Sequence, residues 1–180
     1  MADLLDDRYR FGSELIVEAA ALAQRYYETQ ESLTVRSKGT QDVVSEADTE
    51  VEKLIRTAVE KRFPNDAFFG EEFGHNDVEG AEAIWIVDPI DGTQPFLSEL
   101  SSWCVSIGFA HEGVLEMGFL AAPARDEIFV GRVGHGATLN GRPIRVSDST
   151  SLDDGLLLIG MSPRIGADEI VPIVDALLRQ

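Results

Sequence analysis

One short run constrains the fold of this chain more than any other. Residues 84–96 read Ile-Trp-Ile-Val-Asp-Pro-Ile-Asp-Gly-Thr-Gln-Pro-Phe. The first four are apolar, do not alternate and are rich in β-branched types, which predicts a buried strand. We expect it to stop at Asp88, because Pro89 cannot donate to a sheet ladder and Gly92 permits backbone angles closed to other residues. Asp88 and Asp91 then lie just past the carboxyl end of the strand, where α/β sheets place ligands.

This pair of carboxylates has the chemistry of a divalent-cation site. Mg²⁺ and Ca²⁺ take oxygen ligands from carboxylates and backbone carbonyls, so the carbonyl of Ile90 is a natural third donor. Gly92 and Thr93 have the pattern of a first helical turn, whose free N–H groups bind phosphate oxygens. The alternative is that Asp-Pro and Asp-Gly are ordinary turn pairs without a ligand.

Three motifs, taken together, resemble those of one family. The run from Trp85 to Thr93, with Phe96 shortly after, resembles the signature of the inositol monophosphatase family, which are Mg²⁺-dependent and commonly lithium-sensitive phosphomonoesterases. Gly70-Glu71-Glu72 resembles the family's Gly-Glu-Glu motif. The segment from Lys38 to Asp48 resembles its Lys-x-x-x-Asp-x-Val-Thr-x-x-Asp motif, with Ser45 in place of Thr.

The resemblance and the element pattern give the same expectation for the fold. Helices followed by many strands predict an α/β (α+β) protein in layers, with two N-terminal helices on a largely antiparallel sheet, as in sugar phosphatases. We expect an N-terminal metal-site domain over 1–150 and the start of an incomplete C-terminal α/β domain over 151–180. Family members are longer, and in them a later Trp-Asp motif supplies one more metal carboxylate, which the sequence to Gln180 does not contain. The 180-residue chain alone is therefore expected to be weakly active or inactive.

Local patterns predict the individual elements. In chain order they are a helix over 6–29, strands over 33–36 and 43–44 around a turn at 37–40, a helix from Ser45 to just before Pro64, a strand at 67–69, a polar loop at 74–80, strands at 102–110, 114–121, 127–132 and 137–146 with a hairpin at Asn140-Gly141, a strand at 156–159 and a helix over 168–178.

Several polar residues have two interpretations. Asp48 is either the acid of a capping box that begins with Ser45, or a carboxylate that reaches a metal. Glu71 and Glu72 mark either an exposed turn or, because a strand at 67–69 delivers them as the later strand delivers Asp88, part of the same site. Lys38 is either a solvated loop lysine or a residue close to that site.

The resemblance implies a ligand set for two or three Mg²⁺ ions per site. Glu71, Asp88 and the Ile90 carbonyl would hold the first ion, and Asp88 with Asp91 the second. Asp48 would be an outer ligand or the ligand of a third ion. Ca²⁺ or Mn²⁺ could replace Mg²⁺, and Li⁺ would inhibit.

The same resemblance implies roles in hydrolysis by a metal-activated water. Glu71 would orient the attacking water and, with Thr93, accept its proton. The amides of Gly92 and Thr93 would hold the phosphoryl oxygens. Lys38 and Glu72 would act on the water and the ligands rather than on the metal itself.

The substrate class follows from the resemblance only. Inositol monophosphate is the expected phosphate monoester, with histidinol phosphate, a sugar bisphosphate or an adenosine bisphosphate as alternatives. A further alternative is a non-catalytic relative that acts through dimerisation or a partner surface. The sequence departs from the family at Gln94-Pro95-Phe96, where Asn commonly precedes Phe; Pro95 stiffens this turn and affects substrate contacts rather than metal binding.

Composition excludes several other classes. The net charge of −17 argues against nucleic-acid binding through the chain's own surface, because phosphate backbones are held by clustered Lys and Arg. A single cysteine, Cys104, permits neither an internal disulfide nor a thiolate metal site and fits a reducing cytoplasm. No apolar segment approaches membrane-spanning length, and the N-terminus is acidic. We expect a cytoplasmic protein, a homodimer by resemblance, without a membrane partner.

Overall fold

The fold is that of a computed structural model, which describes residues 2–29, 35–39, 42–76, 78–151, 154–155, 158–160 and 165–179. The chain divides into two compact units, residues 1–145 and 146–180, and each is described by itself.

The first unit is built on an eight-stranded sheet with the order β10-β9-β8-β7-β6-β5-β3-β4. β3 and β5 are parallel, and every other neighbouring pair in this sheet is antiparallel. The strands are β3 Ala67–Gly70, β4 Gly74–Asn76, β5 Ala83–Asp91, β6 Cys104–His111, β7 Val114–Ala122, β8 Glu127–Arg132, β9 Gly136–Leu139 and β10 Arg142–Ile144. A separate two-stranded sheet pairs β1 Val35–Gly39 with β2 Asp42–Ser45.

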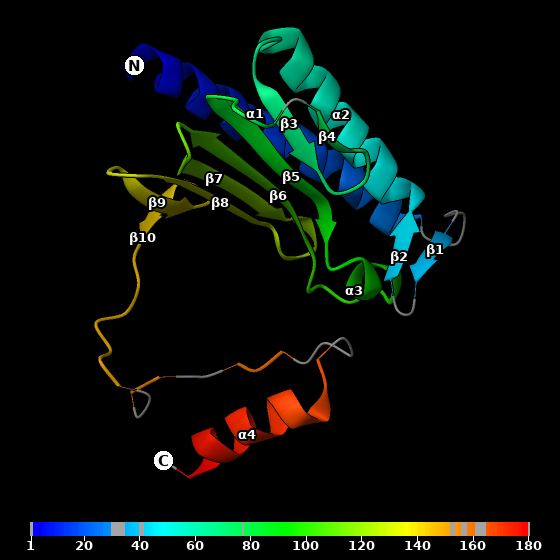
Figure 1. The fold of residues 1–180 in the computed structure, drawn as a ribbon, viewed down its shortest axis with the longest axis vertical. Helices are drawn as coiled ribbons and strands as arrows, with labels where there is room; N and C mark the ends of the chain where they lie inside the picture. The colour runs from blue at the N-terminus through cyan, green and yellow to red at the C-terminus, as the bar shows by residue number, and fades with distance from the viewer. Residues whose placement is uncertain are drawn as a thin grey trace. The chain divides into compact units, whose positions relative to one another are not determined.

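Two long helices, α1 (Ala2–Glu28) and α2 (Glu46–Arg62), cover one face of this sheet (Figure 1). Their apolar residues recur every three or four positions, so each helix has one face to bury. In α2 this face comprises Val51, Ile55 and Val59, all fully buried. The predicted arrangement of two helices on a largely antiparallel sheet is confirmed.

An aromatic cluster joins the helices to the central strand. The ring of Trp85 in β5 lies 5.6 Å from Phe11 of α1 and 5.0 Å from Phe109 of β6, measured between centroids. The indole Nε1 of Trp85 donates to Asp66 at 2.9 Å, and Arg8 of α1 makes two hydrogen bonds to the same carboxylate, at 2.6 and 2.8 Å. A buried polar group needs such partners, so these bonds fix the register of α1 on the sheet.

The structure corrects the prediction for β5. The strand does not stop at Asp88 but continues to Asp91, with a register shift between these two residues. At such an irregularity a residue can lie outside the ladder, which is where a sheet tolerates Pro89. The strand is also buried on one face only: Trp85 is fully buried, whereas Ile86 is 41% exposed.

Three further local predictions were wrong. Residues 37–39 belong to β1 rather than a turn, because they pair across to β2. Residues 74–76, predicted as loop, form the short edge strand β4 by pairing with β3. Residues 158–160 are not in a strand, and Leu158 is 85% exposed. Residues 33, 34, 156 and 157, which belonged to predicted strands, lie outside the described residues.

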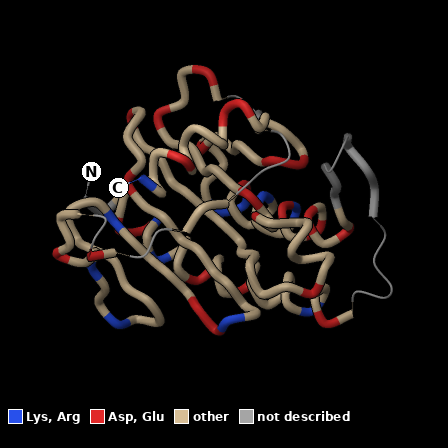
Figure 2. Tube along the Cα trace, turned by 90° about the horizontal axis from the view of Figure 1, so that it is seen from below, with Lys and Arg blue, Asp and Glu red and all other residues tan. Residues whose placement is uncertain are grey.

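The hairpin and helix predictions are otherwise confirmed. Asn140 and Gly141 both have positive φ, at 49° and 74°, as a tight hairpin turn requires. The second unit contains α4 (Ala167–Leu178), close to the predicted 168–178. No helix in the described part of the chain combines the length and apolar character needed to cross a membrane. Asp and Glu outnumber Lys and Arg by 32 to 15 and are spread along the trace rather than gathered in one segment (Figure 2).

Candidate active site

The parallel pairing of β3 and β5 brings two of the predicted ligands together. Gly70 at the end of β3 is opposite Val87 of β5, and the N–H of Glu71 donates to the carbonyl of Val87 at 3.2 Å. The residues that follow, Glu71 just after β3 and Asp88 within β5, therefore lie at the same edge of the sheet. The two side chains are close enough that the charge of Glu71 acts on the carboxyl group of Asp88.

Several charges at this edge act on the carboxyl group of Asp88. Burial raises the pKa of its carboxyl group from the ordinary 3.8 to about 8, assisted by the charges of Glu71, Asp91 and Asp48. Its Oδ1 atom is buried and has no hydrogen-bond partner in the described structure. A buried oxygen without a hydrogen-bond donor costs free energy. A donor or a cation beside Oδ1 would therefore stabilise the site.

A short helix, α3 (Thr93–Leu97), follows β5. Its first residue forms a hydrogen bond to Asp48 of α2. It begins at Gly92, whose φ of 95° is open only to glycine at little cost, so the predicted helical turn is confirmed. The hydroxyl group of Thr93 donates to the carbonyl of Ile90 at 3.3 Å and to Oδ1 of Asp48 at 3.1 Å.

One of the two sequence interpretations of Asp48 is confirmed by the structure. Its Oδ2 accepts the N–H of Ser45 at 2.8 Å, so the capping box is confirmed. Its Oδ1 accepts the hydroxyl of Thr93, and the carboxylate is only 2% exposed. The contact with Thr93 was not predicted from the sequence, because the two residues are far apart along the chain. A role as metal ligand stays a prediction.

The donor set fits a divalent cation in its chemistry. A hard cation relieves the repulsion that neighbouring carboxylates exert on Asp88 and supplies a partner for its buried oxygen, which lacks a donor. Yet within the described residues no three His, Cys, Asp or Glu side chains are grouped so that they could hold an ion. Glu71 and Asp88 are in contact, whereas the exposed Asp91 would have to turn toward them.

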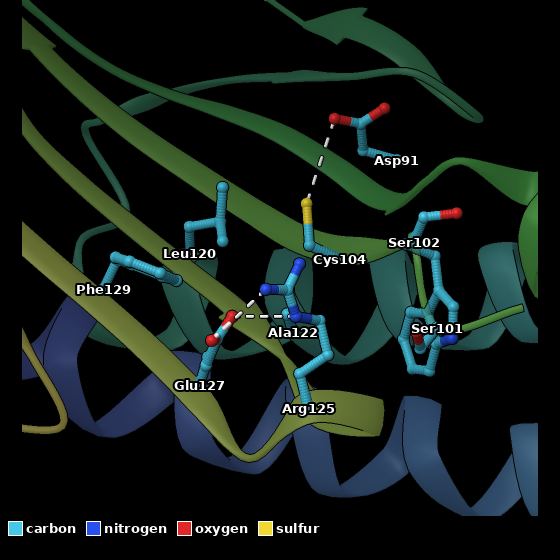
Figure 3. A pocket seen from close by; sticks show the side chains of 10 residues that line it. Asp91, Ser101, Ser102, Cys104, Leu120, Ala122, Arg125, Glu127 and Phe129 are labelled. Carbon is cyan, nitrogen blue, oxygen red and sulfur yellow. Dashed lines mark hydrogen bonds and ion pairs between the residues drawn. The ribbon is translucent and has the colours of Figure 1, made fainter. Parts of the chain in front are cut away.

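A cavity of about 330 Å³ adjoins Asp91 (Figure 3). Cys104 lies in it with Sγ 3.9 Å from Oδ2 of Asp91, and Arg125 pairs with Glu127 across it at 3.1 Å. Burial and the charges of Asp91 and Asp88 raise the pKa of the Cys104 thiol to about 12. The thiol therefore stays protonated at neutral pH.

Other predicted site residues are placed as follows. Ile90 is buried and Gly92 begins α3, as described above. Glu72 donates its N–H to Glu52 of α2 at 2.7 Å. Lys38 lies in β1 rather than in a loop, and its side chain is outside the described residues. The sequence interpretation missed Glu52, although its spacing of four from Arg56 was a visible signal for an ion pair on one helix face.

A two-helix layer on a largely antiparallel sheet, with carboxylates at the ends of neighbouring parallel strands, defines a layered α/β protein of the sugar-phosphatase type. The model of the inositol monophosphatase family matches residues 4–168, and the chain belongs to this family.

Relatives with different names support this assignment. The chain is 38% identical over 144 residues to the Nus factor SuhB of Pseudomonas aeruginosa (79% of this chain, 53% of the relative), 39% identical over 134 residues to a histidinol-phosphatase of Chlorobaculum parvum (74% and 51%), and 39% identical over 172 residues to inositol monophosphatase 3 of Solanum lycopersicum (91% and 61%). The chain thus spans about half the length of these relatives.

Solved structures show the same fold. The extragenic suppressor protein SuhB of Bartonella henselae superimposes with a TM-score of 0.74 at 34% identity, over 78% of this chain and 54% of that one. A staphylococcal inositol monophosphatase II gives 0.65 at 28% identity, over 79% and 51%.

Proposed function

We propose that this chain carries the divalent-cation site of a phosphomonoesterase. The observation that carries the proposal is Asp88, whose buried Oδ1 lacks a donor and whose pKa is about 8. Glu71, the carbonyl of Ile90 and Asp91 would complete the ligand set, with Asp48 as an outer ligand. When bound, Mg²⁺ would supply positive charge at the phosphoryl group and acidify a water molecule.

The chain's own residues would transfer the proton and bind the phosphate. The hydrogen bond from Oγ1 of Thr93 to Oδ1 of Asp48 gives the hydroxyl proton a carboxylate acceptor, so Thr93 could take a proton from a water as it passes its own to Asp48. Glu71, exposed at the same edge, would orient that water. The amides of Gly92 and Thr93, at the start of α3, would hold phosphoryl oxygens.

Inositol monophosphate is the proposed substrate. The tomato relative is an inositol monophosphatase, and the staphylococcal relative was solved with inositol monophosphate bound. Histidinol phosphate is the second candidate, because the Chlorobaculum relative is a histidinol-phosphatase. Sugar and adenosine bisphosphates are further candidates by resemblance. A cytoplasmic homodimer with Mg²⁺, replaceable by Ca²⁺ or Mn²⁺ and inhibited by Li⁺, remains the expectation.

A phosphate-release panel tests this function. We expect slow Mg²⁺-dependent phosphate release from inositol 1-phosphate, abolished by EDTA and by Asp88→Asn, in keeping with the weak activity expected of the 180-residue chain. Asp126→Asn is the matched control: it removes a carboxylate from a turn with φ of 56°, a conformation that Asn tolerates well. Faster release from histidinol phosphate would reassign the substrate. No release from any ester, with cation binding intact, would favour a non-catalytic relative, as the name Nus factor for the Pseudomonas relative allows.

A further inference from the structure

A fully buried glutamate holds the turn that carries Glu71. Glu52 of α2 is 0% exposed. Its Oε2 accepts the N–H of Glu72 at 2.7 Å, and its Oε1 accepts the N–H of Phe73 at 3.1 Å. One carboxylate therefore binds two consecutive amides immediately after Glu71. Charge-assisted bonds of this kind are about twice as strong as neutral ones.

Arg56, four residues further along α2, contacts the end of the segment that follows Glu71. Its Nη2 lies 3.4 Å from Oε1 of Glu52 and donates to the carbonyl of Gly74 at 3.0 Å. Its guanidinium group lies over the ring of Phe68, 4.5 Å from the centroid. The pair thus binds an N–H at the start of the turn and a carbonyl at its end.

The approach of α2 to the turn depends on Gly70. A Cβ at this position would lie 2.1 Å from Oε1 of Glu52, closer than any real contact. Gly70 has no positive φ, so its backbone conformation would accept alanine and only the contact with Glu52 excludes it. The Gly-Glu-Glu motif therefore needs its glycine to admit the Glu52 carboxylate.

We infer that Glu52 is a positioning residue for the cation site, an inference that rests on the proposed function. Residue 71 is held between two anchors: its own N–H bonds to Val87 of β5, and the next two amides bond to Glu52. This fixes the backbone from which the Glu71 side chain meets Asp88. Partners that orient metal ligands typically contribute 10–100-fold in metal affinity.

Two variants disturb this contact in different ways. Glu52→Gln keeps the size of the side chain but replaces one accepting oxygen with an NH₂ group, so one of the two amides loses its acceptor. Gly70→Ala keeps the charge and displaces the carboxylate. Glu50→Gln is the matched control, because Glu50 is on the same helix and, within the described residues, its one ion pair is the solvent-exposed contact with Lys53 at 3.5 Å.

The experiment combines amide hydrogen exchange with calorimetric titration of Mg²⁺ and of Ca²⁺ on the folded 180-residue chain. We expect Glu52→Gln and Gly70→Ala to speed exchange at the amides of Glu72 and Phe73 and to raise the cation Kd at least 10-fold. The control Glu50→Gln should match the unsubstituted chain in both measurements. A role in stability alone would lower the melting temperature without changing the Kd measured well below it.

Each outcome either supports or overturns the positioning role of Glu52. A Kd within twofold of the unsubstituted chain in both variants, or unchanged exchange at the two amides, overturns the inference. If Glu52→Gln does not fold, Gly70→Ala decides by the same criteria. Absence of cation binding by the unsubstituted chain also overturns it. Failure of the phosphate-release panel with cation binding intact would refute the proposed activity but leave the positioning role of Glu52 in place.

Discussion

The protonation of Asp88 couples the site to the stability of the whole fold. Its pKa is about 8 in the folded state and 3.8 in a solvated chain, so between these values the folded state holds a proton that the unfolded state has lost. The free energy of unfolding of the metal-free protein should therefore fall as pH rises from about 4 to about 8. After allowance for solvent screening of this partly exposed group, we expect a loss of about 2 kcal/mol.

Urea denaturation in EDTA across this pH range measures the effect. Asp88→Asn should flatten the profile and be the more stable protein at pH 8. Asp91→Asn, which removes an exposed carboxylate at the same edge, should flatten it less. A profile that rises with pH in the unsubstituted chain would contradict the assigned burial of Asp88.

The bond between Thr93 and Asp48 gives a second prediction at the residue scale. Thr93→Val keeps the shape of the side chain but removes the donor to a carboxylate that is 2% exposed. Leaving a buried acceptor unpaired costs about 1–3 kcal/mol, so the free energy of unfolding should fall by this amount. Thr93→Ser retains the hydroxyl and should lie close to the unsubstituted protein. Equal stability of the two variants would show that the bond contributes nothing.

At the scale of elements, α1 is joined to the turn between α2 and β3 by one buried ion pair. Arg8 and Asp66 have side chains 12% and 3% exposed, and Asp66 also accepts from Trp85 of β5. Removing one member of a buried pair leaves an uncompensated charge, so Asp66→Asn should lower the free energy of unfolding by about 3 kcal/mol. The control is Asp7→Asn, which breaks the more exposed pair with Arg62 and should cost less than about 1 kcal/mol. Chemical denaturation compares the two; similar losses would argue against a special role for Asp66.

At the scale of the whole molecule, a cation should stabilise the fold. The carboxylates at the edge of β3 and β5 repel one another without an ion, and binding to the folded state alone shifts the unfolding equilibrium. At 100 times the dissociation constant, one site contributes roughly 2.7 kcal/mol. Thermal melts with and without millimolar Mg²⁺ or Ca²⁺ should show this shift, and the double variant Asp88→Asn, Asp91→Asn should lose it. An equal shift in both proteins would place cation binding elsewhere.

Features that depend on neighbouring residues along the chain are predictable from the amino-acid sequence. The apolar periodicity of α1 and α2, the capping box at Ser45 and the hairpin at Asn140-Gly141 follow from local chemistry. The placement of Glu71 and Asp88 near each other was predicted from two apolar strands that each lead into motif residues, although β5 continues past Asp88 to Asp91. These features need no information about which strand lies beside which.

Contacts between residues far apart in the sequence depend on how the elements pack. The continuation of β5 to Asp91 depends on pairing with Cys104 of β6, and β4 exists because it pairs with β3. Asp48 accepts a hydrogen bond from Thr93, which is 45 positions away in the sequence, and Glu52 accepts one from Glu72, 20 positions away. The free-energy cost of burying a carboxylate depends on its hydrogen-bond partners. Which residues become those partners depends on the packing of α2 against the sheet rather than on any pattern in the sequence.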